Sequence, residues 1–298
     1  MVAASHSLTR RAPPLERPEF IRNVDDVPTD LKVERPLSLA ERIYQIDPVR
    51  QFSLLLILAA IWQAYALWIN NPLVLPSFGA AIEALWDGFT RGPLLLRAVT
   101  SLKLLVLGYA AGIVVAVLLT LAAISTRIGT DLLNLFTAMF NPLPAIALLP
   151  LALLWFGLGE KSLIFVLVHA VLWPLALNAY TGFQGVSETL RLAGQSFGLR
   201  HLNFAVKILI PAAFPAILTG LKIGWAFAWR TLIAAELVFG VSSGNGGLGW
   251  YIFENRNQLE IPAVFAGLLT VIGIGLLVES VIFRSIERAT VRRWGMQR

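Results

Sequence analysis

Three of the titratable side chains inside long apolar stretches of the sequence could act on an ion or a charged solute. Arg230 and Glu236 share one stretch, and His169 lies in another. A charge at the centre of a bilayer costs about 2.5–3.5 kcal/mol on insertion scales, so each is expected to face protein or water. Arg230 could give an anion pathway its positive potential; the alternatives are a structural ion pair or a side chain that extends to the membrane surface. Glu236 is a second pathway candidate, with helix packing near the outer end as its alternative.

The spacing of these residues bears on how they could work together. Arg230 and Glu236 are six residues apart, which places them on different faces of a straight helix and disfavours a direct pair. A lone histidine without a chain of intramembrane acids is more often a hydrogen-bonded packing residue than a proton relay, and we favour that interpretation for His169. A secondary transporter or channel that works alone, with His169, Arg230 and Glu236 as its ion-coupling set, is the competing function. It would require acids in several spans and repeated hydropathy halves, and neither is evident.

A polar and proline-rich interruption lies within a further apolar stretch. Asn141, Pro142 and Pro144 would break a helix there and free backbone carbonyl groups. Irregular backbone at membrane depth is tolerated only where protein or a water-filled cavity covers it, and broken spans near the midplane recur at transport sites. The alternative is a simple kink. We predict a translocation pathway lined by these three residues together with Arg230 and Glu236.

No pattern of residues indicates enzyme chemistry. The sequence has no HExxH or GxSxG motif, and it has no cysteine. Its histidines (His6, His169 and His201) fall in a tail, a span and a loop, so no metal site is expected. Residues 244–249, GNGGLG, fit a dinucleotide fingerprint but follow a membrane span rather than a buried strand. No phosphate-binding GxxxxGK[ST] occurs, so we expect no cofactor, and an ATP-driven mechanism would need a partner subunit that binds the ATP.

The elements that must position these residues are membrane-spanning helices. The chain of 298 residues is 57% hydrophobic and 14% charged, whereas about a quarter of the residues of a soluble domain are charged. A span needs roughly 20 apolar residues. The segments that meet or approach this length are 52–69, 102–124, 132–158, 162–181, 208–241 and 263–282. We therefore predict an all-α integral membrane protein with about six transmembrane helices; the prolines predict that the third and fifth have a broken or tilted first part.

Basic residues predict the orientation of the chain. Lys and Arg concentrate in residues 1–50, in the segment between the fourth and fifth spans and at the C-terminus, which places both termini in the cytoplasm. The net charge of +6 follows from these membrane-flanking clusters, so it does not indicate nucleic-acid binding. We divide the chain into a cytoplasmic tail, 1–50, and a transmembrane domain, 51–298. Within the tail, residues 37–46 form either an interfacial helix or a loosely ordered lead-in to the first span.

One polar segment between two spans has the pattern of a docking element. We call residues 183–211 the Gly198 loop. Residues 188–197 can form a short helix, Gly198 permits a sharp reversal, and residues 199–207 can start a second helix. Pro211 and Pro215 are expected to keep the backbone from continuing straight into the bilayer. Because this cytoplasmic helix-turn-helix has few uses within a membrane protein, we expect it to dock another protein.

The sequence GLRHLNFAVKILIPAAFP, residues 198–215, resembles the EAA-loop signature of permease subunits of ATP-binding-cassette importers. Gly198 matches the loop glycine, and Ile210 with Pro211 matches the hydrophobic-proline step. Leu192 occupies the position of the family's glutamate. The resemblance implies that the loop couples to an ATPase through Ala193, Gly194, Gly198, Leu199, Arg200, Ile210 and Pro211.

Further segments resemble the nitrate, sulfonate and taurine permeases within that family. They are LPLALLWFGLGEKS (149–162), AWRTLIAAEL (228–237) and GGLGWYI (246–252). The resemblance implies a type I importer permease fold in the inner (cytoplasmic) membrane. It also implies a dimer, expected to be a homodimer, with a pair of cytoplasmic ATPase subunits and an extracytoplasmic, for example periplasmic, substrate-binding protein. The implied function is ATP-coupled import of a small organic or inorganic anion such as taurine, an alkanesulfonate or nitrate.

Overall fold

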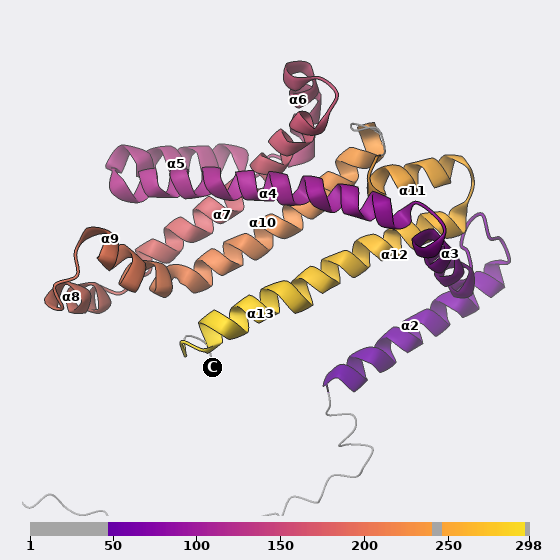
Figure 1. Ribbon diagram of the computed structural model, residues 1–298, viewed down its shortest axis with the longest axis horizontal. Helices are drawn as coiled ribbons and strands as arrows, with labels where there is room; N and C mark the ends of the chain where they lie inside the picture. The colour runs from indigo at the N-terminus through magenta and orange to yellow at the C-terminus, as the bar shows by residue number, and fades with distance from the viewer. Residues whose placement is uncertain (1–46, 240–245, 296–298) are drawn as a thin grey trace, which may run out of the picture. The chain divides into compact units, whose positions relative to one another are not determined.

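The computed structural model describes residues 47–239 and 246–295, and within these ranges the chain is helical apart from turns and short connections (Figure 1). The chain divides into two units, Met1–Leu55 and Leu56–Arg298. Of the first unit, the description covers only the beginning of one helix. The predicted interfacial helix at 37–46 and most of the predicted tail lie outside the described residues.

The helices confirm the prediction of an all-α membrane protein. Within residues 47–239 and 246–295, five helices are long and apolar enough to cross a bilayer, or six if a bent pair is counted as one span. Four of these helices are α2 (Asp47–Ile69), α4 (Leu94–Ser125), α7 (Glu160–Gln184) and α10 (Ile210–Phe239). The remaining long helix begins as α12 (Ile261–Leu277) and continues through η4 (Val278–Phe283), α13 (Arg284–Glu287) and η5 (Arg288–Arg292); it corresponds to the predicted sixth span. The bent pair is α5 (Arg127–Phe140) followed by η2 (Ala145–Leu148) and α6 (Leu149–Phe156).

Shorter helices connect the spans. They are α3 (Phe78–Thr90), α8 (Glu188–Ser196), α9 (His201–Phe204), η3 (Ala205–Leu209) and α11 (Leu248–Asn257). Ser77 caps α3, since its side chain accepts a hydrogen bond from the backbone N–H of Ala80 at 3.1 Å.

The third span is broken, as its prolines predict. Its two halves meet at an angle of 91° across the connection between Phe140 and Ala145. Pro142 and Pro144 in this connection carry no backbone N–H, so a continuous helix would lack two hydrogen bonds there. The break lies in the middle of the span rather than in its first part.

The predicted fifth span, 208–241, is not broken within its described residues, so the prediction of a break in its first part is wrong. Helix α10 continues through Pro211 and Pro215 to Phe239. The π-helical turns of η3 precede it, and there the N–H of Ile210 donates to the carbonyl of Ala205 five residues back. Local π-helical turns of this kind accommodate prolines in membrane helices. The carbonyl of Pro215 accepts a hydrogen bond from Thr219 Oγ1 at 3.0 Å.

Helix α7 packs against both α4 and α10 (Figure 1). Small residues let the backbones approach closely: a Cβ added at Gly108 of α4 would lie 2.6 Å from Leu167 Cβ, and one at Gly220 of α10 would lie 2.9 Å from Asn178 Cβ. Lipid tails are as apolar as leucine, so close packing of this kind holds membrane helices together. Among the candidate spans of the described chain, α7 is the most buried.

This packing predicts that Gly108→Ala destabilises the protein. The added methyl group overlaps Leu167, and overpacking of this kind typically costs about 1–3 kcal/mol. Gly273→Ala is the control, because Gly273 lies in α12 with no atom within 4 Å of an added Cβ. Thermal denaturation of the two purified variants in detergent should show a lower midpoint for Gly108→Ala alone. Equal midpoints would contradict the close α4–α7 contact.

Candidate functional site

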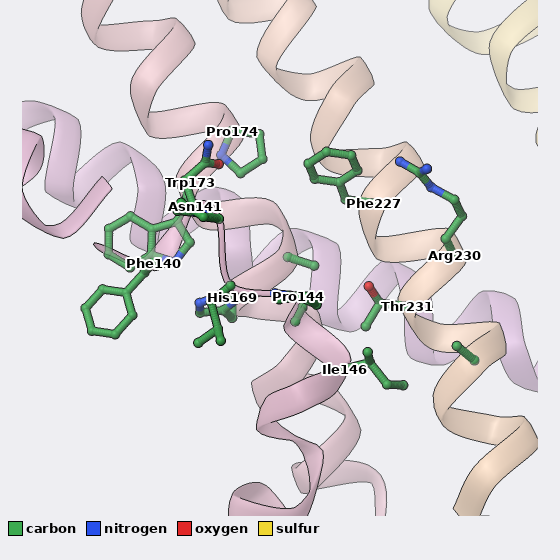
Figure 2. A pocket seen from close by; sticks show the side chains of 15 residues that line it. Phe140, Asn141, Pro144, Ile146, His169, Trp173, Pro174, Phe227, Arg230 and Thr231 are labelled. Atoms are coloured by element: carbon green, nitrogen blue, oxygen red, sulfur yellow. The ribbon is translucent and has the colours of Figure 1, made fainter. Parts of the chain in front are cut away.

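A cavity of about 400 Å³ lies between the break of the third span, α7 and α10 (Figure 2). Asn141, Pro142 and Pro144 line it from the break, and Arg230 lines it from α10. The structure therefore brings together four of the five residues that the sequence predicts for a pathway. The irregular backbone of the break borders this cavity, as expected for non-helical backbone at membrane depth.

Arg230 has no carboxylate partner within ion-pair distance among the residues that the structure describes. Its Nε donates to the carbonyl of Ala226 at 3.1 Å, and its Cζ lies 4.9 Å from the centroid of the Phe227 ring. This stacking orients the guanidinium without neutralising it. The side chain is exposed in the single chain, so its charge is available to the cavity.

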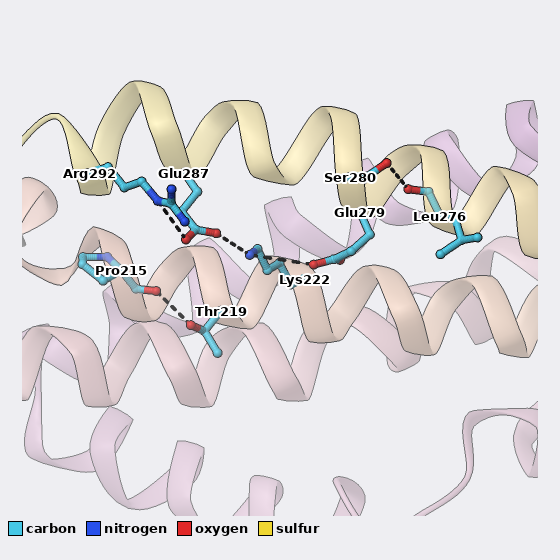
Figure 3. Close-up of polar contacts among 8 residues, drawn as sticks. All are labelled: Pro215, Thr219, Lys222, Leu276, Glu279, Ser280, Glu287 and Arg292. Atoms are coloured by element: carbon cyan, nitrogen blue, oxygen red, sulfur yellow. Dashed lines mark hydrogen bonds and ion pairs between the residues drawn. The ribbon is translucent and has the colours of Figure 1, made fainter. Parts of the chain in front are cut away.

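The other basic residue of α10 is neutralised. Lys222 Nζ lies 2.8 Å from Glu287 Oε2 and 3.9 Å from Glu279 Oε1, both on the helix that continues from α12 (Figure 3). Glu287 also pairs with Arg292, at 3.8 Å. Lys222 thus ties two helices together, whereas Arg230 contributes an unbalanced positive charge to the cavity.

His169 lines the same cavity from α7, and one part of its predicted role is wrong. Neither ring nitrogen has a hydrogen-bond partner in the described part of the protein, although both are buried. The ring packs edge-on against Phe140 at 6.3 Å and Trp173 at 6.0 Å between centroids. Among the described residues, His169 therefore packs against aromatic rings and makes no side-chain hydrogen bond.

Trp173 is a cavity residue that the sequence analysis did not assign. It is 7% exposed, stacks on Phe140 with 5.4 Å between centroids, and its Nε1 has no acceptor among the described residues. The sequence feature that could have indicated this role is its position four residues after His169, which places both side chains on one face of α7. The cavity is therefore lined by His169 and Trp173 of α7 as well as by Arg230 of α10.

Glu236 is the predicted pathway residue that does not line the cavity. It is 2% exposed, and both its carboxylate oxygens lie 2.8 Å from Ser101 Oγ. The carboxylate also accepts from the N–H of Gly249 at 2.9 Å, while Ser101 Oγ accepts from the N–H of Leu248 at 2.8 Å. A Cβ at Gly247 would overlap both side chains. We call these five residues the Glu236 clasp.

The clasp joins α4, α10 and the beginning of α11. It explains Gly247 and Gly249 of the GGLG sequence, because the Glu236 side chain lies too close to both for a Cβ to fit. A buried carboxylate is tolerated where hydrogen bonds replace its lost hydration, and here Ser101 of α4 and Gly249 of α11 supply the donors. Since Glu236 lies in the clasp and His169 and Arg230 line the cavity, the structure does not bring the three together as one ion-coupling set.

The Gly198 loop has the predicted helix-turn-helix form. Gly198 follows α8 with φ of 73°, a left-handed conformation that disfavours residues with a Cβ. Its N–H donates to the Gln195 carbonyl at 2.9 Å, and the N–H of Leu199 donates to the Gly194 carbonyl at 3.1 Å. These hydrogen bonds end α8 and turn the chain into α9.

The residues predicted to couple to an ATPase do not share one environment. Gly194 is buried, and a Cβ there would lie 2.9 Å from the Phe204 ring and 3.0 Å from Ile208. Its neighbour Ala193 is exposed, as are Gly198 and Arg200. Leu199 and Arg200 border a hollow with Gln195 and Phe204, and Ile210 and Pro211 form the first turn of α10.

Two large apolar side chains on α8 and its turn face solvent in the single chain. Phe197 is 85% exposed, and Leu192, at the place of the family's glutamate, is 56% exposed. Exposed apolar side chains on a polar segment mark a protein contact when they cluster. The sequence analysis did not assign Phe197 to a docking surface. The feature that could have indicated this role is its large apolar side chain directly before the reversal at Gly198.

Apolar helices surround a cavity lined by Arg230, which has no carboxylate partner among the described residues, and this arrangement fits a membrane transport protein. The chain belongs to the family of binding-protein-dependent transport system inner membrane components, which it matches over residues 108–293. It is therefore a multi-pass transport subunit rather than an enzyme. Permeases of this family function in general with ATPase and substrate-binding partners.

Named relatives agree with this family. A protein of Methanocaldococcus jannaschii, named provisionally as an ABC transporter permease, is 32% identical over 81% of this chain and 91% of its own length. The taurine transport system permease protein TauC of Escherichia coli is 30% identical over 76% of this chain and 83% of its own length. The nitrate import permease protein NrtB of Synechocystis is 28% identical over 84% of this chain and 90% of its own length.

The Glu236 clasp predicts that Ser101→Ala lowers stability. The change removes a donor to a buried carboxylate and the acceptor of the Leu248 N–H, and an unsatisfied buried group costs about 1–3 kcal/mol. Thr100→Val is the matched control, because the Thr100 hydroxyl bonds only the Leu96 carbonyl of its own helix among described residues. Denaturation midpoints in detergent measure the difference; a drop as large for Thr100→Val would contradict the clasp.

Proposed function

We propose that the chain is the permease subunit of an ATP-binding-cassette importer that carries a small organic or inorganic anion, coupled to ATP hydrolysis on a partner ATPase. The observation that carries the coupling is the Gly198 loop, which holds the exposed Phe197 at a rigid reversal. The relatives named for taurine and nitrate support an anion as substrate. Arg230, which lines the cavity and has no carboxylate partner among the described residues, also supports a negatively charged substrate.

The Gly198 loop docks the ATPase in this proposal. Phe197 and Leu192 supply apolar contact area and Arg200 supplies a charge, while Gly194 lets α8 pack tightly on Phe204. Aromatic and arginine side chains are the residues that most often dominate the binding energy of protein interfaces. The loop binds as a preformed element, so little ordering is needed on contact.

Movement of the docked loop reaches the cavity through continuous helix. Helix α8 rests on Phe204 and Ile208, and η3 continues into α10, which carries Arg230. ATP-driven closure of the ATPase pair moves α8, and the rigid path from η3 to α10 passes this motion to the cavity lined by Asn141, Pro142 and Pro144. The outcome is alternating access of the cavity to the two sides of the membrane.

The remaining partners and the orientation follow from the family and the charges. A second copy of the chain completes the pathway, and an extracytoplasmic binding protein delivers the anion. The protein lies in the inner membrane with both termini and the Gly198 loop in the cytoplasm, as the distribution of Lys and Arg supports. Residues 1–50 are a cytoplasmic tail. The chain needs no cofactor of its own, since the ATPase subunits bind the ATP.

Gly198→Val is expected to uncouple ATP hydrolysis from uptake. A Cβ at φ of 73° costs about 1–2 kcal/mol, which lowers the population of the docking conformation roughly tenfold. Uptake by cells, membrane insertion and ATPase activity of the purified complex are measured together. Gly295→Val is the control, since Gly295 has φ of 69° and no atom near an added Cβ but lies outside the loop. Normal uptake by Gly198→Val would contradict the docking role.

Phe197→Ala is expected to weaken association with the ATPase by about tenfold or more, because truncation of a central aromatic side chain at an interface typically costs at least about 2 kcal/mol. The measurement is the amount of ATPase that co-purifies with a tagged permease. Trp86→Ala is the control: Trp86 is 70% exposed but lies on α3, outside the Gly198 loop. If Phe197→Ala retained as much ATPase as the control, Phe197 would not be part of the interface.

A further inference from the structure

Helix α8 of the Gly198 loop is joined to the end of α7 by an arginine that the proposed function does not use. Arg191 Nη2 donates to the carbonyl of Phe183 at 2.7 Å, and its Nε donates to the carbonyl of Val186 at 3.2 Å. Phe183 lies in the last turn of α7, and Val186 lies in the turn between α7 and α8. One side chain of α8 therefore bridges the end of α7 and the connection that follows it.

The charge of Arg191 favours this contact. The last carbonyl groups of a helix have no partner within the helix and carry the negative end of its dipole. A guanidinium presents several donors in a fixed plane, and hydrogen bonds from a charged donor are stronger than neutral ones. Arg191 has no carboxylate within ion-pair distance among the described residues, so the carbonyl groups of Phe183 and Val186 are its hydrogen-bond partners there.

The connection between α7 and α8 leaves little freedom to either helix. It consists of residues 185–187. Val186 is only 7% exposed, and the Ser187 hydroxyl caps α8. On its other side, Gly194 brings α8 against Ile208 of η3, which continues into α10. Helix α8 is thus held on two sides, by the end of α7 and by the lead-in to α10.

Helices α7 and α10, which both adjoin α8, pack closely against each other (Figure 1). A Cβ added at Gly182 of α7 would lie 2.7 Å from Ala216 Cβ of α10, and one added at Gly220 of α10 would lie 2.9 Å from Asn178 Cβ. Protein interiors packed this closely transmit strain. Both helices also line the cavity, so they connect it to the two attachments of α8.

We propose that Arg191 is a positioning residue that fixes α8 to α7, so that the docked Gly198 loop moves α7 and α10 together. The inference rests on the proposed function, in that the loop is taken to dock the ATPase. It adds a second attachment to the path through η3. Without Arg191, α8 stays attached to α10 but turns relative to α7, and part of the movement of the ATPase is lost before it reaches the cavity.

The distance between α7 and α8 tests this attachment in the purified permease alone. The sequence has no cysteine, so paired spin labels can be placed with Lys161→Cys in the first turn of α7 and Ser196→Cys in the last turn of α8. Both positions are exposed in the single chain. Double electron–electron resonance should give one narrow distance distribution. Arg191→Met is expected to broaden it, because methionine removes the donors but keeps a long unbranched side chain.

The complete complex with its ATPase tests the consequence for transport. Arg191→Met is expected to retain the bound ATPase and its hydrolysis but to lower uptake per ATP hydrolysed roughly tenfold, because hydrogen bonds from a charged group are lost. Arg191→Lys is expected to give an intermediate value, since an ammonium group lacks the planar fork that reaches both carbonyl groups. Arg127→Met is the matched control: Arg127 begins α5, is exposed and makes no side-chain hydrogen bond or ion pair with a described residue.

Three results would overturn the positioning role. They are a distance distribution as narrow in Arg191→Met as in the parent protein, a lower denaturation midpoint with unchanged uptake per ATP, and loss of the bound ATPase, which would make Arg191 a docking contact. Arg191→Lys serves the same measurements if Arg191→Met does not insert into the membrane. If the parent protein bound no ATPase, the proposed function would fail, and the distance measurement would still decide whether Arg191 fixes α8 to α7.

Discussion

Close packing of α7 between α4 and α10 is the constraint on which the cavity depends. Gly108 and Gly220 allow the neighbouring backbones to approach α7 to distances that a Cβ would prevent. This contact places the face of α7 that carries His169 and Trp173 against the broken third span and α10. In a bilayer, apolar side chains gain no free energy by moving from lipid into protein. Close packing at small residues therefore stabilises helix association, as hydrophobic burial does in soluble proteins.

Helix α10 connects the features that bear on transport. It begins at the end of the Gly198 loop, carries Arg230 at the cavity about two thirds of the way along, and presents Glu236 to the clasp with α4 and α11 near its end. The π-helical turns of η3 keep this path helical despite Pro211 and Pro215. The helix is therefore continuous from η3 to the cavity, and the clasp holds the other end of α10 against α4 and α11.

The charges of α10 differ in function because their surroundings differ. Lys222 is paired with Glu287 and Glu279, and Glu236 is enclosed by donors from Ser101 and Gly249. These groups serve the packing of helices. Arg230 is stacked on Phe227 and faces the cavity, with no carboxylate beside it in the described chain. An intramembrane charge without a structural partner is the one most suited to a solute.

The sequence by itself determined the class of fold, the positions of the spans, the break at Asn141–Pro144 and the reversal at Gly198, because apolar length and proline and glycine conformations are local properties. It also indicated the intramembrane charges. It could not place them: Glu236 belongs to the clasp, and His169 makes no side-chain hydrogen bond with any residue that the structure describes. Nor did the sequence assign Trp173 to the cavity. The continuity of α10 through its prolines likewise depended on its π-helical lead-in. Only the tertiary structure decided these points, since they depend on which helix faces meet and on how closely glycines let them approach.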